Sequence, residues 1–211
     1  MNRCYQTDLS GFNFEYLNGT RFQAVYDTLN LAKGLYEVDK GSCCTKLRFA
    51  LEIVLSEVIE ICNLKNSKRK NINGNIELIK NHIPRSLRDY NGEDIAIEMH
   101  NVRMHGNDST HYDQNSDVDI DKAAHTSWIA MRKICKWVSR LEPLYAKYIE
   151  EESIRKAREA EEERRRKARE AEEERRRNEE IKATVVKGLK WVGAAALAIL
   201  GGAILDQIRK K

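Results

Sequence analysis

The chain has 211 residues, which is long enough for one hydrophobic core, and 33% of them are charged while 41% are hydrophobic. The net charge of +4 is small for 37 basic and 33 acidic residues, so the overall charge does not by itself argue for nucleic-acid binding, and any such binding must be local. Composition changes along the chain predict three domains: a globular domain over 1–142, a charge-dense rod over 143–182 and an apolar segment with basic flanks over 183–211.

The first region has the apolar spacing of a helical bundle. Apolar residues recur at steps of three and four, Pro84 closes a short helix, and Asn91-Gly92 is expected to open the next. No segment alternates with the period of two that is typical of strands, so we expect an all-α bundle of about four to six helices. The predicted helices cover about residues 22–32, 46–62, 75–82, 93–105 and 119–141.

Two of these helices have a clear inner face. The residues expected to point inward are Leu47, Leu51, Val54, Leu55, Val58, Ile61 and Cys62 on the second helix and Ala124, Trp128, Met131, Cys135, Val138 and Leu141 on the last. The cysteines, five in number, lack the paired C-x-x-C spacing of zinc sites and redox loops. We therefore expect reduced thiols, no metal and no cofactor.

The most site-like pattern follows the fourth predicted helix. Arg103, Asn107 and His111 lie at steps of four residues, and on a continuous helix they would project from one face. A guanidinium, an amide and an imidazole together can bind an anion and move protons near neutral pH. The segment from Gly106 is equally compatible with a helix-ending turn, in which case Arg103 could pair with Glu52 and His111 could buttress the loop.

A family resemblance depends on four features in fixed order. They are Phe12 to Leu17, a helix holding Leu47-Arg48 with Glu52, the pattern Arg-x-x-Gly-Asn-x-x-x-His over 103–111, and a helix ending Trp137-Val138-Ser139-Arg140-Leu141. Over about residues 12–142 this order resembles the HEPN-like helical domain of unknown function, found at the N-terminus of type I restriction-enzyme R subunits and in stand-alone host-defence proteins. The resemblance implies a dimer in which two motif faces meet across a two-fold axis.

The wider HEPN superfamily suggests a chemistry for this motif. Its nuclease members use an Arg-polar-x-x-x-His motif that cleaves RNA without metal. Aligning Asn107 and His111 with that motif puts Gly106 where the arginine is expected and Arg103 one turn upstream. We expect Arg103 to bind the charged phosphorus centre, His111 to move protons and Asn107 to orient either of them, with His100 as a possible auxiliary.

A basic loop is the second candidate for RNA contact. Lys68, Arg69 and Lys70 could touch phosphates, although a solvated loop explains these charges equally well.

The charged rod contains an exact repeat. Residues 156–166 and 167–177 are the same eleven-residue sequence, rich in helix formers, with Glu161 to Glu163 placed four residues before Arg165 to Lys167. These features favour a single solvated helix that acts as a spacer of roughly 60 Å. A disordered linker and a straight association of rods stay open as alternatives.

The last region carries an uncharged run from Trp191 to Leu205. At fifteen residues the run is short against the roughly 20 that a bilayer requires, and extending it backwards includes Lys187 and Lys190. A tail-anchored span, an interfacial or re-entrant insertion, self-association through small residues and a buried oligomerisation helix all fit the pattern. We expect 183–211 to associate with a membrane and, because Met1 to Ser10 has no apolar run typical of an export signal, the large domain to face the cytoplasm.

Together these features predict a membrane-tethered HEPN-like effector of antiviral defence or stress response. Its expected partners are RNA or a nucleotide, the membrane, and further copies of itself as a homodimer or higher homo-oligomer. The sequence leaves open whether the domain is a metal-independent endoribonuclease. The alternative is a non-enzymatic membrane effector or adaptor, whose bundle senses a partner and whose C-terminal helix oligomerises or perturbs the bilayer.

Overall fold

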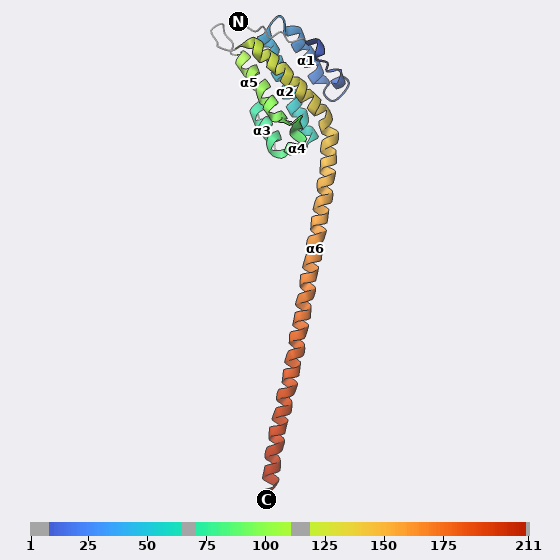
Figure 1. Cartoon of the computed structure of the whole chain (residues 1–211), viewed down its shortest axis with the longest axis vertical. Helices are drawn as coiled ribbons and strands as arrows, with labels where there is room; N and C mark the ends of the chain where they lie inside the picture. The colour runs from blue at the N-terminus through green and yellow to red at the C-terminus, as the bar shows by residue number, and fades with distance from the viewer. Residues whose placement is uncertain (1–8, 65–70, 111–118, 210–211) are drawn as a thin grey trace. The chain divides into compact units, whose positions relative to one another are not determined.

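A computed structural model describes residues 9–64, 71–110 and 119–209, with side chains up to residue 187 except at positions 10 and 110 (Figure 1). The chain divides into two compact units, Met1–Ile149 and Glu150–Lys211. The first unit is the helical bundle, and the second is the greater part of the last helix.

The described residues confirm an all-α fold. Two short 3₁₀ helices, η1 and η2, precede six α-helices, and a minimal antiparallel strand pair lies before α5. The elements are η1 (Leu9–Gly11), η2 (Glu15–Leu17), α1 (Gln23–Leu35), α2 (Lys40–Ile61), α3 (Ile72–His82), α4 (Arg85–Arg88), β1 (Asp89–Tyr90), β2 (Glu93–Asp94), α5 (Ile95–Thr110) and α6 (Ile120–Arg209).

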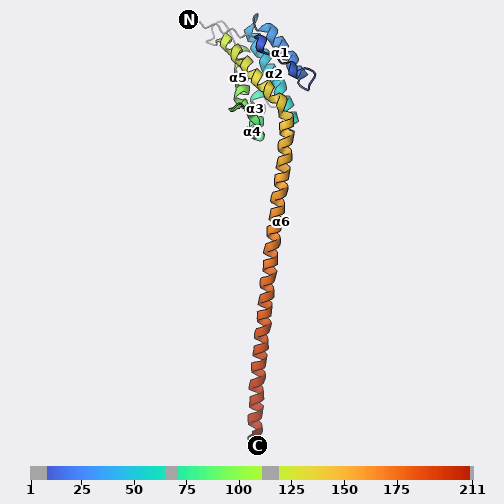
Figure 2. The same ribbon diagram turned by 45° about the vertical axis from the view of Figure 1, so that its right-hand side comes forward.

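Helix α2 is at the centre of the bundle and packs along both α1 and α5 (Figures 1 and 2). The inner faces expected for α2 and for the start of α6 are confirmed, because every residue predicted to point inward is buried except Ile61, which packs half-buried against the core.

Trp128 is fully buried and makes an edge-on contact with Phe12 at 5.8 Å between ring centroids. The N-terminal segment thus closes the core over α6.

The start of α2 was predicted too late. The segment at Asp39 and Gly41 suggested a break that lasted to residue 46, whereas α2 begins at Lys40. Asp39 is its N-cap, and the Asp39 carboxylate accepts the Ser42 backbone N–H at 2.9 Å. This bond satisfies one of the donors that a helix start leaves free, so the helix can begin before its apolar stripe does.

The expected start of the fourth helix at Glu93 is wrong. Asn91 and Gly92 both have positive φ, 57° and 85°, which is the geometry of a tight hairpin turn between β1 and β2. Asp89 supports the turn by accepting the Gly92 N–H at 2.9 Å. Helix α5 therefore begins only at Ile95, and its far end also differs, because it continues to Thr110.

The compact unit that contains the bundle includes the part of α6 just after Pro143. Pro143 lies inside α6 without ending it, and two residues later the Tyr145 hydroxyl donates to the Cys62 carbonyl oxygen at 3.1 Å. Because Tyr145 still packs against the core, the first unit includes residues up to Ile149.

The second unit is helical, as the repeat predicts. Side chains four residues apart form ion pairs along it, Arg165 with Glu161 at 2.6 Å and Lys167 with Glu163 at 2.7 Å. Where side chains are described, no helix is long and apolar enough to cross a membrane. The run from Trp191 to Leu205 lies where only the backbone is described.

Candidate functional site

One side of α5 carries the residues singled out from the sequence. We call His100, Arg103 and Asn107 the α5 edge. Arg103 and Asn107 lie one turn apart and are both half-buried on a helix that is continuous to Thr110, so these two side chains leave the same side of α5. His111 follows Thr110 directly in sequence and lies outside the described residues.

Gly106 has a packing role instead of a turn role. The alternative in which a turn at Gly106 ends the helix is wrong, because α5 continues through it. A Cβ atom at this position would lie 2.4 Å from Arg48 Cβ and 2.8 Å from Arg48 Cδ. The absence of a side chain at Gly106 thus lets α5 approach α2 closely enough for the Arg48 side chain to lie against its backbone.

Helices α2 and α5 run antiparallel where they meet. Thr45 Oγ1 and Ser109 Oγ share a hydrogen bond at 3.3 Å, and Arg48, one turn further along α2, lies against Gly106, one turn earlier on α5. This register is the reason that Arg48, which the sequence analysis assigned no role, lies beside the α5 edge.

Glu52 pairs with Arg48 instead of with Arg103. Its Oε1 lies 3.4 Å from Arg48 Nη2, a pair one turn apart on α2 with both side chains partly exposed. The Nε atoms of Arg48 and Arg103 are both buried without a hydrogen-bond partner. Both guanidinium groups therefore keep unused donor capacity.

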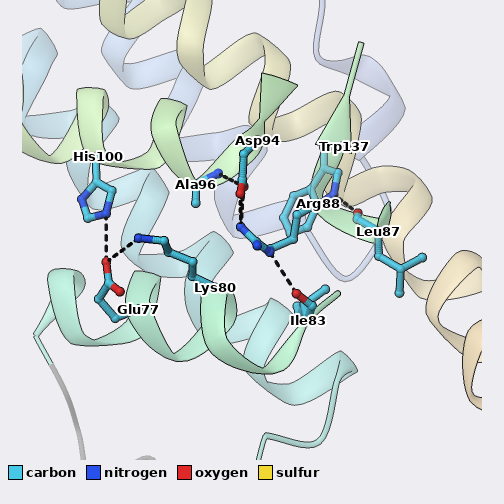
Figure 3. A network of polar contacts seen from close by, with 9 residues as sticks. All are labelled: Glu77, Lys80, Ile83, Leu87, Arg88, Asp94, Ala96, His100 and Trp137. Atoms are coloured by element: carbon cyan, nitrogen blue, oxygen red, sulfur yellow. Dashed lines mark hydrogen bonds and ion pairs between the residues drawn. The ribbon is translucent and has the colours of Figure 1, made fainter. Parts of the chain in front are cut away.

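His100 is already engaged by α3. Its Nε2 lies 3.4 Å from Glu77 Oε1, and the same carboxylate oxygen lies 3.5 Å from Lys80 Nζ (Figure 3). The α5 edge is thus bordered by α3 at His100.

His105 lies on the opposite flank of α5 and was not considered in the sequence analysis. Its Nδ1 is 3.1 Å from the hydroxyl of Ser127, a fully buried residue of α6. Burial lowers the pKa of His105, so its ring is neutral at neutral pH. Its half-buried contact with α6 gives it a structural role in the bundle.

A buried ion pair fixes the start of α5 (Figure 3). The Arg88 guanidinium donates to both carboxylate oxygens of Asp94 and, through Nε, to the Ile83 carbonyl oxygen at 2.9 Å. Asp94 also accepts the Ala96 N–H at 3.0 Å, as an N-cap of α5 does. This network joins α3, α4 and the strand pair to α5, and thereby sets where the α5 edge begins.

The described residues offer no group of three or more His, Cys, Asp or Glu side chains arranged to hold a metal ion. Cys43, Cys44 and Cys62 are buried free thiols, and burial raises the pKa of each to about 12. Thiols that stay protonated are poor nucleophiles, so they do not contribute to a catalytic site. The predicted RNA-contacting residues of the basic loop, Lys68, Arg69 and Lys70, lie outside the described residues.

No family model, curated protein or solved structure matches the chain. The resemblance to the HEPN-like domain therefore rests on the motif residues themselves.

Proposed function

We propose that the bundle is an HEPN-like effector domain of a defence or stress response, which binds phosphates of RNA or of a nucleotide at the α5 edge and cleaves RNA there without metal. The observation that carries this proposal is that Arg103 and Asn107 share one face of a helix that continues to Thr110, the residue before His111. The spare donor capacity of Arg103 supports it further.

The chemistry requires three events. A base removes the proton of the RNA 2′-hydroxyl, the extra negative charge on phosphorus is stabilised, and an acid protonates the leaving 5′-oxygen. In the proposal His111 transfers protons, Arg103 binds the phosphorane oxygens through its fork of donors, and Asn107 orients either group. Two copies of the chain facing one another would supply both an acid and a base.

Replacing His111 by alanine is expected to reduce RNA cleavage by about a hundredfold or more, because general acid–base catalysis contributes on that scale. The assay follows a labelled single-stranded RNA with the full chain and excess EDTA. His82→Ala, at an exposed position of α3, is the control and should cleave like the parent. Equal cleavage by the parent and His111→Ala would refute the catalytic proposal.

The second part of the proposal is a membrane tether. It is supported by the exposed apolar side chains of Ile181, Val185 and Val186, which are followed by Lys187, Lys190 and then the uncharged run from Trp191. The same observation favours the second candidate function, a non-enzymatic membrane effector or adaptor in which this segment oligomerises or perturbs the bilayer.

Deleting 187–211 distinguishes the two functions. If the bundle is the effector and the tail a tether, the shortened chain moves from the membrane fraction to the soluble fraction and keeps its RNA cleavage. For the non-enzymatic function, the deletion abolishes the cellular effect while His111→Ala retains it. A full-length chain that never sediments with membranes would contradict the tether in both cases.

A further inference from the structure

Two arginines from different helices have the same unusual feature. Arg48 Nε and Arg103 Nε are both buried, and neither has a hydrogen-bond partner in the protein. Buried N–H groups are nearly always paired, since leaving one unpaired costs free energy. The protein itself therefore leaves donor capacity unused on both arginines.

The register between α2 and α5 brings these two side chains to the same level. Arg48 lies against Gly106, and the Arg48 guanidinium extends toward Glu52, one turn further along α2. Because the helices are antiparallel, one turn along α2 corresponds to one turn back along α5, which is the position of Arg103. The two guanidinium groups therefore belong to one stretch of the α2–α5 contact.

The net charge of Arg48, Arg103 and Glu52 favours binding of an anion. Arg48 and Arg103 bring two positive charges, and Glu52 contributes one negative charge. The separation of 3.4 Å between Glu52 and Arg48 is longer than the roughly 2.7–2.9 Å of a charge-assisted hydrogen bond, so Glu52 orients the guanidinium without occupying its donors fully. The Arg48 and Glu52 side chains are 31% and 38% exposed, which leaves the group accessible from solvent.

We infer that Arg48 and Arg103 together bind a single phosphate group, with Glu52 positioning Arg48. A tetrahedral phosphate offers several acceptor oxygens, and two guanidinium groups can donate to different ones at the same time. This inference rests on the proposed function for the identity of the ligand as RNA, but the phosphate site itself can be tested separately. It makes Arg48 a binding residue that the motif of α5 alone does not include.

The test measures binding of a 2′-O-methyl oligoribonucleotide, which cannot be cleaved through its 2′ position, to the full chain at several salt concentrations. Arg48→Gln and Arg103→Gln are each expected to weaken binding about tenfold to a hundredfold. Because both act on one phosphate, the double variant should bind little worse than either single variant, and the slope of log K against log salt should fall by about 0.7 in total.

Arg85→Gln is the matched control, because it removes the same charge at an exposed position of α4. It should bind within about twofold of the parent, as expected for a distant surface charge. Arg48→Lys keeps the charge and most of the side chain but lacks the planar guanidinium. If this variant loses binding while its Tm is unchanged, the loss is due to the missing guanidinium and not to misfolding.

Two results with RNA would overturn the inference, and a pyrophosphate measurement decides it if RNA does not bind. If Arg48→Gln binds RNA as tightly as the parent, Arg48 is not part of the phosphate site, and the proposed function stays intact. If the loss of binding free energy in the double variant equals the sum of the two single losses, the arginines bind two separate phosphates. If the parent binds no RNA, the proposed function fails, and inorganic pyrophosphate then decides the inference alone: it must raise the Tm of the parent and of Arg85→Gln but not of Arg48→Gln.

Discussion

Replacing Asp94 by alanine is expected to destabilise the bundle by about 3–5 kcal/mol, the usual cost of removing one partner from a buried ion pair. Arg88, only 6% exposed, would keep its charge in the interior without an acid, and α5 would lose the carboxylate that accepts the Ala96 N–H. Urea unfolding of the full chain, followed by tryptophan fluorescence, measures the change through Trp128 and Trp137, which are both buried in the bundle.

A surface ion pair provides the control. Lys80→Met breaks the pair with Glu77, in which both side chains are exposed, and should change stability by less than about 1 kcal/mol. Adding Arg88→Met to Asp94→Ala should restore part of the loss, because it removes the unpaired buried charge. A loss below about 1 kcal/mol for Asp94→Ala would show that the pair does not hold the start of α5.

The second large effect is expected at Gly106. A glycine inside a helix normally costs roughly 0.5–1 kcal/mol relative to alanine, so Gly106→Ala would stabilise an isolated helix. In the bundle the new Cβ would lie 2.4 Å from Arg48 Cβ, and neither atom can be rotated away, because the backbone fixes both. The helices must separate, and we expect a net destabilisation of about 1–3 kcal/mol in the same unfolding experiment.

Gly34→Ala is the matched control for this substitution. Gly34 lies in α1, is exposed, and would place its Cβ with no atom within 4 Å. It should therefore gain roughly 0.5–1 kcal/mol. Opposite signs for the two substitutions are the expected result, and a stabilising Gly106→Ala would contradict the close approach of α2 and α5.

The sequence predicts the long helices well and their ends poorly. The inner faces of α2 and α6 were predicted because burial along a helix leaves a repeat of three and four residues. The strand pair was missed because strands of two residues are too short to show an alternation of apolar and polar residues. Asn91-Gly92 was the available signal, since both residues tolerate the positive φ of a tight hairpin.

The candidate site was predicted in part. Arg103 and Asn107 could be placed on one face because their spacing alone determines it once the helix is continuous. Arg48 could not be placed, because its position depends on how closely two helices distant in sequence approach each other. Gly106 carried that information, but a glycine before an asparagine is also a common helix terminator, and local sequence does not distinguish the two roles.

The close approach at Gly106 has a consequence for how precisely Arg48 and Arg103, the two arginines proposed to bind a phosphate, can be held. At this crossing the Arg48 side chain lies directly against the α5 backbone, so the spacing of the two helices is set by the Arg48 Cβ and the main chain at Gly106. Insertions in the connecting segments, or changes of length in the repeat region, would leave that spacing unaltered. A single methyl group at the crossing would change it directly.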